Sequence, residues 1–417
     1  MAAIRNPKRI VITGIGIIAP NGIGKEPFWR SLVEGISGIK KISSFDTTLF
    51  PCTVAGEIPN FNPADFIESK KIKRLDRFVQ LALSATKLAL ADAKLDINAT
   101  AKERIGVACG TATAGQGWVF EQYEIFREKG YKRLSPFTAA STFPNASSAS
   151  ISIEVGATGP SVTFSSGCAS GAEAIGYAMD LLRTGRVDIM IVSASEALLY
   201  PPIFGSYCAT NLLTKLNGMP ISTPRPFDKT RDGIVLSEVA GTLILETLDS
   251  ATRRSASIYA EIIGYGETCD AFHPIAQDPL GTQATRAMEL ALVEADIPIT
   301  DVNYVKLHGT GDPSLDLIET KALKKLFGKQ AHQIPMSSIK SMIGHTQGAC
   351  GTIELAACSL AVSTDVIPPT INYSTPDPDC DLMYCPNKAV RTRVNIALAN
   401  TFGFGGKNVA IVLSKYN

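Results

Sequence analysis

A single cysteine lies at a bend whose neighbours suit nucleophilic chemistry. Cys168 stands in VTFSSGCASGAEAIG, between the β-prone run 162–164 and a segment whose apolar residues recur every three or four positions: Ala169, Ala172, Ile175, Met179 and Leu182. This spacing predicts a helix that begins beside the cysteine and ends before Gly185. A helix N-terminus stabilises a thiolate and lowers a cysteine pKa from about 8.5 to roughly 3.5–7.5. Cys168 is therefore predicted to be a nucleophile; the alternative is a small apolar residue that fills a tight turn.

Two of the four histidines follow strand-like runs and open glycine-rich turns. His308 ends VNYVKL and begins HGTGD, and His345 lies in MIGHTQGACG, between IPMSS and an apolar helical segment 353–360. Because active sites of α/β proteins form at the carboxyl ends of strands, we expect both imidazoles in one crevice with Cys168. The alternative for each histidine is a helix cap or a buried partner of a carbonyl group.

Other candidates are ambiguous when taken alone. The run RVNIALANTFGFGGKNVAIVLS predicts two strands joined by a glycine-rich turn, in which a backbone N–H can face a ligand as an oxyanion-hole donor. An ordinary hairpin is the alternative. Asp316 and Glu319 begin a predicted helix, where a capping box accounts for them. Lys340, which precedes His345, is most simply a solvated surface lysine.

Alternating strands and helices are expected to position these groups. Apolar runs bounded by Gly or Pro, such as RIVITGIGII, ERIGVACGT and DIMIVSASEAL, are followed by segments of helical period, which predicts an α/β fold. A chain of 417 residues exceeds the usual size of one core, so two halves are expected. We place the boundary at residue 256. The first half, 1–256, then carries Cys168, and the second half, 257–417, carries both histidines and the FGFGG turn.

The composition excludes several functional classes. A net charge of +1 does not provide the concentrated basic surface that nucleic-acid binding needs. No segment has the length of a membrane span, and IVITGIGIIAPNG is typical of a buried strand and turn. The nine cysteines include no CxxC pair, and the spacing of Cys380 and Cys385 does not suit a zinc knuckle. We therefore expect free thiols, no metal and a cytoplasmic location.

Together these motifs resemble those of the elongating β-ketoacyl-ACP synthases, within the thiolase-like superfamily. The matching runs follow that family's order along nearly the whole chain: VITGIGIIAPNG, TGPSVTFSSGCASGAEAIGYA, RPFDKTRDGIVLSEVAG, GYGETCDAFH, HGTGDPSLDLIE, SSIKSMIGHTQGACGTIE and NTFGFGGKN. SSGCASG, SSIKSMIGH and TPDPDCDLMYCP are similar to the ketosynthase subunits of bacterial type II polyketide systems.

The resemblance implies a five-layered αβαβα fold of two similar halves, acting as a dimer. It also implies a decarboxylative Claisen condensation, without metal or redox cofactor, in fatty-acid or type II polyketide (polyene or aromatic) biosynthesis. Cys168 would carry the acyl chain as a thioester, while His308 and His345 would hold the thioester carbonyl of malonyl-ACP and promote loss of CO2. The N–H groups of Cys168 and Phe404 would form the oxyanion hole, and the Phe404 ring would act as a gate.

Further positions acquire roles only through the resemblance. Lys340 would tune the histidine site, Asp316 and Glu319 would support the active-site network, and Glu354 would be a buried structural partner. Cys109 matches a position that limits acyl-chain length.

The resemblance also implies an acyl carrier protein as partner. Basic docking positions match Lys70, Lys73, Arg74 and Arg225, although a solvated helix face is the alternative for the lysine run. The dimer partner would be an identical chain or a ketosynthase-like paralogue, the chain-length factor.

The chain departs from the family pattern at positions that face the carrier. Asp312 stands where threonine is usual, beside the pantetheine-contacting Thr310, and a carboxylate there would repel malonyl groups or rewire hydrogen bonds. Ile275 replaces another pantetheine-contacting threonine, and Lys407 replaces the threonine after FGFGG.

Related classes fit the motifs less well. A degradative thiolase normally has a second cysteine in the C-terminal glycine turn, which FGFGG lacks. An initiating or chalcone-synthase-like enzyme would carry asparagine in place of His345. The non-catalytic chain-length factor lacks the nucleophile that is present here as Cys168. Asp312 leaves open a weakly catalytic or scaffolding ketosynthase-like subunit of a heterodimer.

Overall fold

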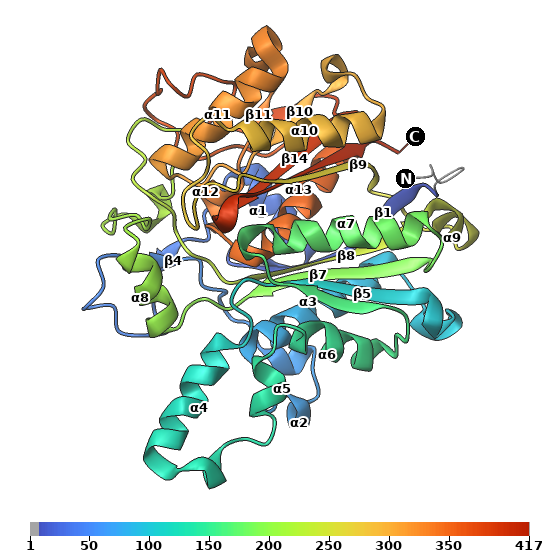
Figure 1. Cartoon of the computed structure of the whole chain (residues 1–417), viewed down its shortest axis with the longest axis vertical. Coiled ribbons are helices and arrows are strands. Elements are labelled where there is room, and N and C mark those ends of the chain that lie inside the picture. Colours follow the sequence, from blue (N-terminus) through green and yellow to red (C-terminus); the bar gives the residue numbers. More distant parts are fainter. Residues whose placement is uncertain (1–7, 417) are drawn as a thin grey trace.

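The computed structural model describes residues 8–416 and shows a mixed α/β molecule (Figure 1). Five strands of the first half take the order β6-β5-β7-β8-β1. β5 runs parallel to β6 and β7, whereas β8 is antiparallel to β7 and β1. Their bounds are β1 (Ile10–Ala19), β5 (Ile105–Gly110), β6 (Ser161–Phe164), β7 (Ile189–Glu196) and β8 (Val239–Thr247).

The second half repeats this topology. Its strands take the order β11-β10-β14-β15-β9 with the same directions of pairing, so the strands of each half, numbered in chain order, read 3-2-4-5-1. β1 and β9 pair over a short stretch and join the two sheets. The bounds are β9 (Ala260–Cys269), β10 (Tyr304–Lys306), β11 (Met336–Ser337), β14 (Ile396–Gly403) and β15 (Lys407–Ser414).

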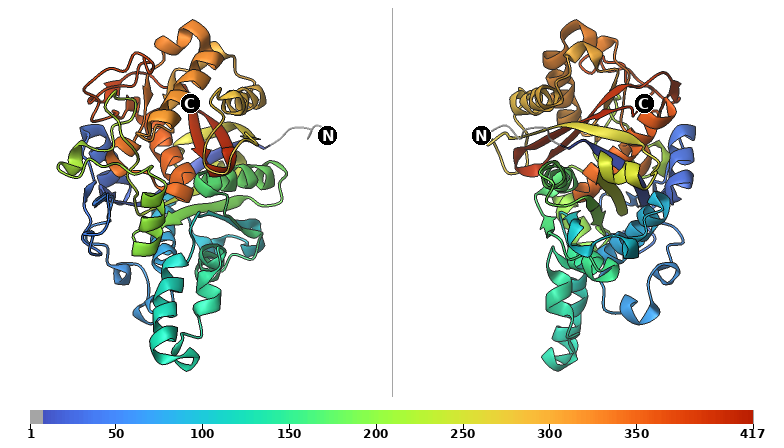
Figure 2. Two further views of the ribbon diagram at one scale, coloured as in Figure 1. Left: turned by 60° about the vertical axis from the view of Figure 1, so that its left-hand side comes forward. Right: turned by 90° about the vertical axis from the view of Figure 1, so that its right-hand side faces the viewer.

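Helices form three layers, outside and between the two sheets (Figures 1 and 2). α3 (Arg77–Ala93) and α6 (Ala146–Val155) cover the outer face of the first sheet, and α10 (Thr282–Ala295) and α11 (Pro313–Phe327) cover the outer face of the second. α7 (Ser170–Arg183) and α13 (Cys350–Thr364) pack together between the sheets. The five-layered αβαβα fold of two similar halves is therefore confirmed.

The two central helices meet through glycines near their N-termini. A Cβ atom added to Gly351 would lie 2.1 Å from the backbone nitrogen of Ala172, and one added to Gly171 would lie 3.0 Å from the carbonyl oxygen of Gly348. No larger side chain fits at Gly351 without a shift of backbone. This close approach brings the turn before α7, which holds Cys168, next to the turn before α13, which follows His345.

The remaining elements lie outside these layers or at their edges. The helices are α1 (Lys25–Glu34), α2 (Ser69–Ile72), α4 (Gln116–Lys129), α5 (Thr138–Thr142), α8 (Pro201–Ala209), α9 (Leu248–Arg253) and α12 (Lys340–Ile343), and the strands are β2 (Gly22–Ile23), β3 (Lys40–Lys41), β4 (Val54–Ala55), β12 (Val366–Ile367) and β13 (Val390–Arg391). α4 and α5 project from the body as an arm in every view (Figures 1 and 2). Residue 256 falls between α9 and β9, and the division of the chain there stays a prediction. Within residues 8–416, no helix combines the length and apolarity needed to cross a bilayer.

Candidate active site

Cys168 occupies the bend predicted from the sequence. It lies in a 3-10 turn, Gly167–Ala169, that leads directly into α7, and Gly167 takes the positive φ of 76° that the bend requires. The thiol is buried and donates a hydrogen bond to Oε1 of Gln347 at 3.1 Å. The backbone N–H of Phe404 also faces the sulfur.

The predicted direction of the Cys168 pKa is wrong. Burial raises the pKa of this thiol well above its ordinary value, and nearby Cys350 raises it further. The Phe404 N–H and the charge of Lys340 act in the opposite direction but do not compensate. Desolvation of the charged form therefore outweighs the helix N-terminus at this site. Without substrate, Cys168 is a neutral thiol.

His308 and His345 lie together in the interior. His308 lies two residues after the end of β10, and His345 lies in the turn between α12 and α13. Their ring centroids are 5.4 Å apart, with the rings nearly perpendicular. Burial lowers the pKa of both imidazoles well below the ordinary value, and the neighbouring Lys340 lowers both further. Both histidines are therefore neutral at physiological pH.

The contacts of each ring also define its tautomer. Nδ1 of His308 accepts the backbone N–H of Phe402 at 3.3 Å and lies 3.2 Å from Nζ of Lys340. Nδ1 of His345 accepts the backbone N–H of Gln347 at 3.0 Å. A neutral imidazole whose Nδ1 is an acceptor carries its proton on Nε2. The pair therefore presents two neutral N–H donors, which can together hold one carbonyl oxygen or enolate.

The FGFGG run joins β14 and β15 in a turn beside Cys168, as predicted. Gly405 and Gly406 have φ values of 76° and 74°, and a Cβ atom on Gly403 would lie 3.2 Å from the Cys168 nitrogen. The Phe404 ring stacks on Tyr207, with centroids 6.5 Å apart. The turn thus holds a backbone N–H at the thiol, while its aromatic ring packs on Tyr207.

The capping-box interpretation of Asp316 and Glu319 is wrong. α11 begins earlier, with Asp312 as its N-cap: Oδ1 of Asp312 accepts the N–H groups of residues 314 and 315. Asp316 instead accepts the Thr310 N–H at 2.7 Å, and Glu319 accepts the N–H groups of residues 308 and 309 at 2.8 and 2.7 Å. Both carboxylates thus hold the HGTGD turn that carries the first histidine.

Lys340 is not a surface lysine. Its side chain is fully buried in α12, where Nζ donates to the carbonyl oxygen of His308 at 2.8 Å and pairs with Oε1 of Glu354. Glu354 lies on α13 and also pairs, through Oε2, with Lys306 of β10. The sequence analysis missed Lys306. The sequence feature that could have identified it is a lysine two positions before His308, on the same face of an apolar strand.

Gln347 was also missed. It has a positive φ of 45°, which is unusual for a residue with a side chain, and it contacts both the Cys168 thiol and the His345 ring. Its position one residue before a glycine in HTQGACG was the available signal. The Phe402 N–H leaves no signal in the sequence, because a backbone donor is the same for every residue type.

A cavity of about 370 Å³ leads from the surface to the Phe404 side of the site. Ile275 and Asp312 line it, together with Leu212, Phe272, Leu315 and Lys321. Thr310 is buried beside it, where its hydroxyl accepts the Asp312 N–H.

The other predicted positions lie farther out. Cys109 is buried on β5, with its side chain in the core cluster of α3 and α6 rather than that of α7. Lys70, Lys73 and Arg74 are exposed in and after α2, and Arg74 lies over the ring of Phe137 on the arm.

Arg225 is less exposed than Lys70, Lys73 and Arg74. Its guanidinium is half-buried in a separate loop and donates to the carbonyl oxygen of Ser222 and to the hydroxyl of Thr230.

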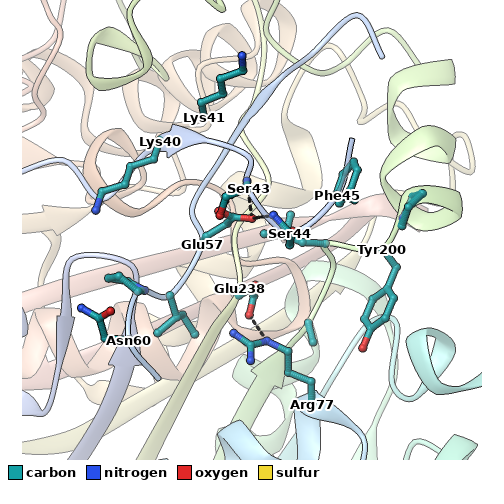
Figure 3. Close-up of a pocket in the computed structure, with 15 residues that line it drawn as sticks. Lys40, Lys41, Ser43, Ser44, Phe45, Glu57, Asn60, Arg77, Tyr200 and Glu238 are labelled. Carbon is teal, nitrogen blue, oxygen red and sulfur yellow. Dashed lines mark hydrogen bonds and ion pairs between the residues drawn. The ribbon is translucent and has the colours of Figure 1, made fainter. Parts of the chain in front are cut away.

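A second cavity, of about 740 Å³, is larger but carries none of these groups (Figure 3). Arg77 and Glu238 form an ion pair of 2.5 Å in its wall, and Glu57 accepts the N–H groups of Ser43 and Ser44. This cavity is lined by neither Cys168 nor either of the two buried histidines. Across residues 8–416 there is also no cluster of His, Cys, Asp and Glu placed to hold a metal ion.

The chain matches known proteins along nearly its whole length. Residues 7–251 match the beta-ketoacyl synthase N-terminal domain, and residues 259–374 match its C-terminal domain. The chain is 41% identical to 3-oxoacyl-(acyl-carrier-protein) synthase 2 of Synechocystis sp., over 98% of both chains. It is 40% identical to the protein of the same name from Staphylococcus aureus, over 98% of this chain and 99% of the other.

Solved structures agree with the sequence matches. The ishigamide ketosynthase/chain length factor superposes with a TM-score of 0.92 at 33% identity, covering 99% of this chain and 100% of the other. A type II PKS ketosynthase bound to a hexaketide, in complex with its acyl-carrier protein, gives a TM-score of 0.90 at 34% identity, covering 98% and 100%. The chain therefore belongs to the β-ketoacyl synthase family and is an acyl-transferring condensing enzyme.

Proposed function

We propose that this condensing enzyme is a β-ketoacyl-ACP synthase in which Cys168, His308 and His345 perform the reaction. The observation that carries the assignment of roles is the paired tautomer: both Nδ1 atoms accept backbone N–H groups, which leaves two Nε2–H donors beside a buried thiol. In a water-poor site, neutral imidazole N–H groups can stabilise an enolate by hydrogen bonds, with no change in the protonation of either ring.

The first half-reaction is acyl transfer. The Cys168 sulfur attacks the acyl-ACP thioester; a C–S bond forms to the enzyme, and the carrier thiol leaves with the proton that Cys168 loses. The N–H groups of Cys168 and Phe404 hold the oxyanion. The raised pKa of Cys168 means that its proton must leave as the attack proceeds.

The second half-reaction is condensation. The malonyl-ACP thioester oxygen binds the two Nε2–H groups, the bond to the carboxylate breaks, and CO2 leaves its electron pair in an enolate. The enolate carbon attacks the acyl carbon, the C–S bond to Cys168 breaks, and the sulfur takes up a proton. Because decarboxylation itself supplies the carbanion, we propose that no metal or redox cofactor takes part.

We propose an acyl carrier protein as the partner, as in the relative that was solved with its carrier. The 370 Å³ cavity supports this proposal, because it runs past Ile275 and Asp312 to Phe404 and can admit a pantetheine arm. Lys70, Lys73 and Arg74 offer an exposed basic surface for an acidic carrier. Arg225 is the weakest of the four docking positions, since its guanidinium already has two internal partners.

We propose that the chain also forms a dimer with an identical chain or with a ketosynthase-like paralogue. β6 is an edge strand of the first sheet, and the arm exposes large apolar side chains: Val119, Tyr123, Phe126, Tyr131, Phe137 and Phe143. Unpaired strand edges and exposed apolar groups favour association. We propose that the product, a fatty acid or a type II polyketide, depends on that partner and on the side chain at position 109. All nine cysteines are free thiols, which supports a cytoplasmic location.

The alternative of a scaffolding subunit depended on Asp312. Because that carboxylate caps α11 through two backbone N–H groups, its presence has a structural reason and does not argue for lost activity.

The test is intact-mass analysis of the protein incubated with acyl-ACP and then malonyl-ACP. Wild type should gain one acyl mass and release it as a β-ketoacyl product. Cys168→Ala should show neither event while unfolding at the same temperature. Cys358→Ala, which removes another buried thiol from α13, is the matched control and should behave like wild type. An acyl adduct on Cys168→Ala would refute the nucleophile.

A further inference from the structure

A second buried lysine lies beneath the histidine pair. Residues 304, 306 and 308 alternate along β10 and its continuation, so that Lys306 points inward on the same side as His308. The Lys306 side chain has no exposed surface, and its Nζ atom forms an ion pair with Oε2 of Glu354 on α13. The other oxygen of this carboxylate pairs with Lys340.

The charges of this cluster do not cancel. When protonated, Lys306 and Lys340 bring two positive charges to the single carboxylate of Glu354, and all three side chains are at most 2% exposed. Burial of a charge without a full counter-charge is unfavourable. A stable fold has no need of this excess, because an apolar residue at position 306 would leave Lys340 and Glu354 as a neutral pair.

The two lysines have different neighbours. Lys340 Nζ reaches beyond Glu354 to the carbonyl oxygen and Nδ1 of His308, at 2.8 and 3.2 Å. In the described part of the chain, Lys306 Nζ pairs with Glu354 alone. Lys306 and Lys340 thus share the Glu354 carboxylate, which would otherwise pair with Lys340 alone. The charge of Lys306 also acts on the histidines through space.

We infer that Lys306 is a positioning residue of the condensation step, which frees the Lys340 ammonium for His308 and adds a positive charge beneath both imidazoles that favours the enolate. This inference rests on the proposed function. The positive charge opposes protonation of His308 and His345, so they stay neutral donors, and it attracts the negative charge that the enolate places on the two Nε2–H groups.

The charge on Lys306 responds to pH. Burial lowers its pKa to about 8, with Lys340 acting in the same direction and Glu354 opposing. Lys306 is therefore charged below about pH 8 and neutral above it, so its contribution is present at neutral pH and is lost as the pH rises.

Other titratable groups surround Lys306. They are Glu354, Cys350 and Cys358 on α13, Lys340 on α12, Glu319 on α11, and the two histidines. Burial raises the pKa of Glu319 to about 7 and that of Cys358 to about 12. The pKa values of Lys340 and Cys350 are raised above their ordinary range, and those of the histidines are lowered. Because Glu319 titrates close to this range, a loss of rate near pH 8 is assigned to Lys306 only if Lys306→Met abolishes it.

The experiment is the pH dependence of single-turnover decarboxylation of malonyl-ACP between pH 6.5 and 9.5. The wild-type rate should fall about tenfold through a midpoint near pH 8, the effect of one unit charge several ångströms away in a partly screened interior. Lys306→Met should be about tenfold slower at pH 7, should lack this fall, and should meet the wild-type rate at pH 9.5. Lys329→Met, at an exposed lysine, should keep the wild-type profile.

Separate outcomes test the inference and the proposed function. Acylation of Cys168 by acyl-ACP should change less than twofold in Lys306→Met, whereas a lysine needed only for folding would affect both steps. A flat wild-type profile through pH 8 overturns the inference without any variant, and so does an unchanged fall in Lys306→Met. If wild type does not decarboxylate malonyl-ACP at any pH, the proposed function itself fails.

Discussion

At the scale of single residues, the histidine pair is defined by the hydrogen bonds on its far side. Each Nδ1 atom is occupied by a backbone N–H, from Phe402 for His308 and from Gln347 for His345. Because a backbone donor does not titrate, each tautomer is fixed whenever the local chain is folded. Substrate therefore meets two N–H groups that already have the right orientation.

This geometry predicts a division of labour for His345. Replacing it by alanine removes one of two donors to the malonyl thioester oxygen, so His345→Ala should slow decarboxylation about 10²- to 10³-fold. Acylation of Cys168 should slow far less, because the oxyanion there uses the N–H groups of Cys168 and Phe404. Release of CO2 and the acyl-enzyme mass report the two steps separately. His332→Ala, at an exposed histidine, is the control, and an equal loss of both steps in His345→Ala would contradict the assignment.

The Cys168 thiol shows that a local run of residues can predict a helix start but not the pKa of a side chain there. The SSGCASG run predicts that Cys168 lies at or next to the start of a helix, and it does lie in the 3-10 turn that leads into α7. The same pattern gives the wrong direction of the pKa, because it contains no information about how deeply the second half of the chain buries that helix end. Gln347, whose side-chain oxygen accepts a hydrogen bond from the thiol, belongs to that second half.

At the scale of elements, the start of α11 links the HGTGD turn to the outer helix layer. Asp312 accepts the N–H groups of residues 314 and 315, while Asp316 and Glu319, farther along α11, accept N–H groups of the turn. The helix N-terminus and the turn of His308 are therefore held by three carboxylates in succession.

The cap makes a prediction about stability. Asp312→Ala leaves two helix N–H groups without a partner and should lower the free energy of unfolding by about 1 kcal/mol. Asp312→Thr keeps a capping oxygen and should lose less than half of that. Urea denaturation measures both, with Asp379→Ala as the exposed control. Equal losses for alanine and threonine would show that the contribution of Asp312 is not that of a cap.

The elements themselves were largely predictable. Strong periodicity located α7, α13 and the two strands around FGFGG, because apolar spacing directly reflects which face of an element is buried. The start of α11 was misplaced because Asp316 and Glu319 satisfy the capping-box pattern as well as the true cap does. Burial of Lys340 could not be inferred, since its partner Glu354 lies on a different helix.

At the scale of the whole molecule, the active site is made where two copies of one topology meet. The turn of Cys168 precedes α7, and the turn after His345 precedes the equivalent helix α13. Both turns contain a residue of positive φ, Gly167 and Gln347, and both helices approach through glycine. The proposed nucleophile and the proposed carbonyl-binding pair thus come from opposite halves, so neither half alone would contain a complete site.

The surface predicts how the carrier approaches. Lys70, Lys73 and Arg74 lie together in and after α2, on a molecule whose overall charge is only +1, so a local patch must attract an acidic partner. Lys73→Glu should weaken carrier binding about five- to tenfold at low ionic strength, and the difference should shrink as salt screens the charges. Titration of carrier protein at two salt concentrations measures both effects. Lys388→Glu makes the same change of charge at an exposed lysine of the second half and should bind like wild type. Unchanged affinity in Lys73→Glu would remove α2 from the docking surface.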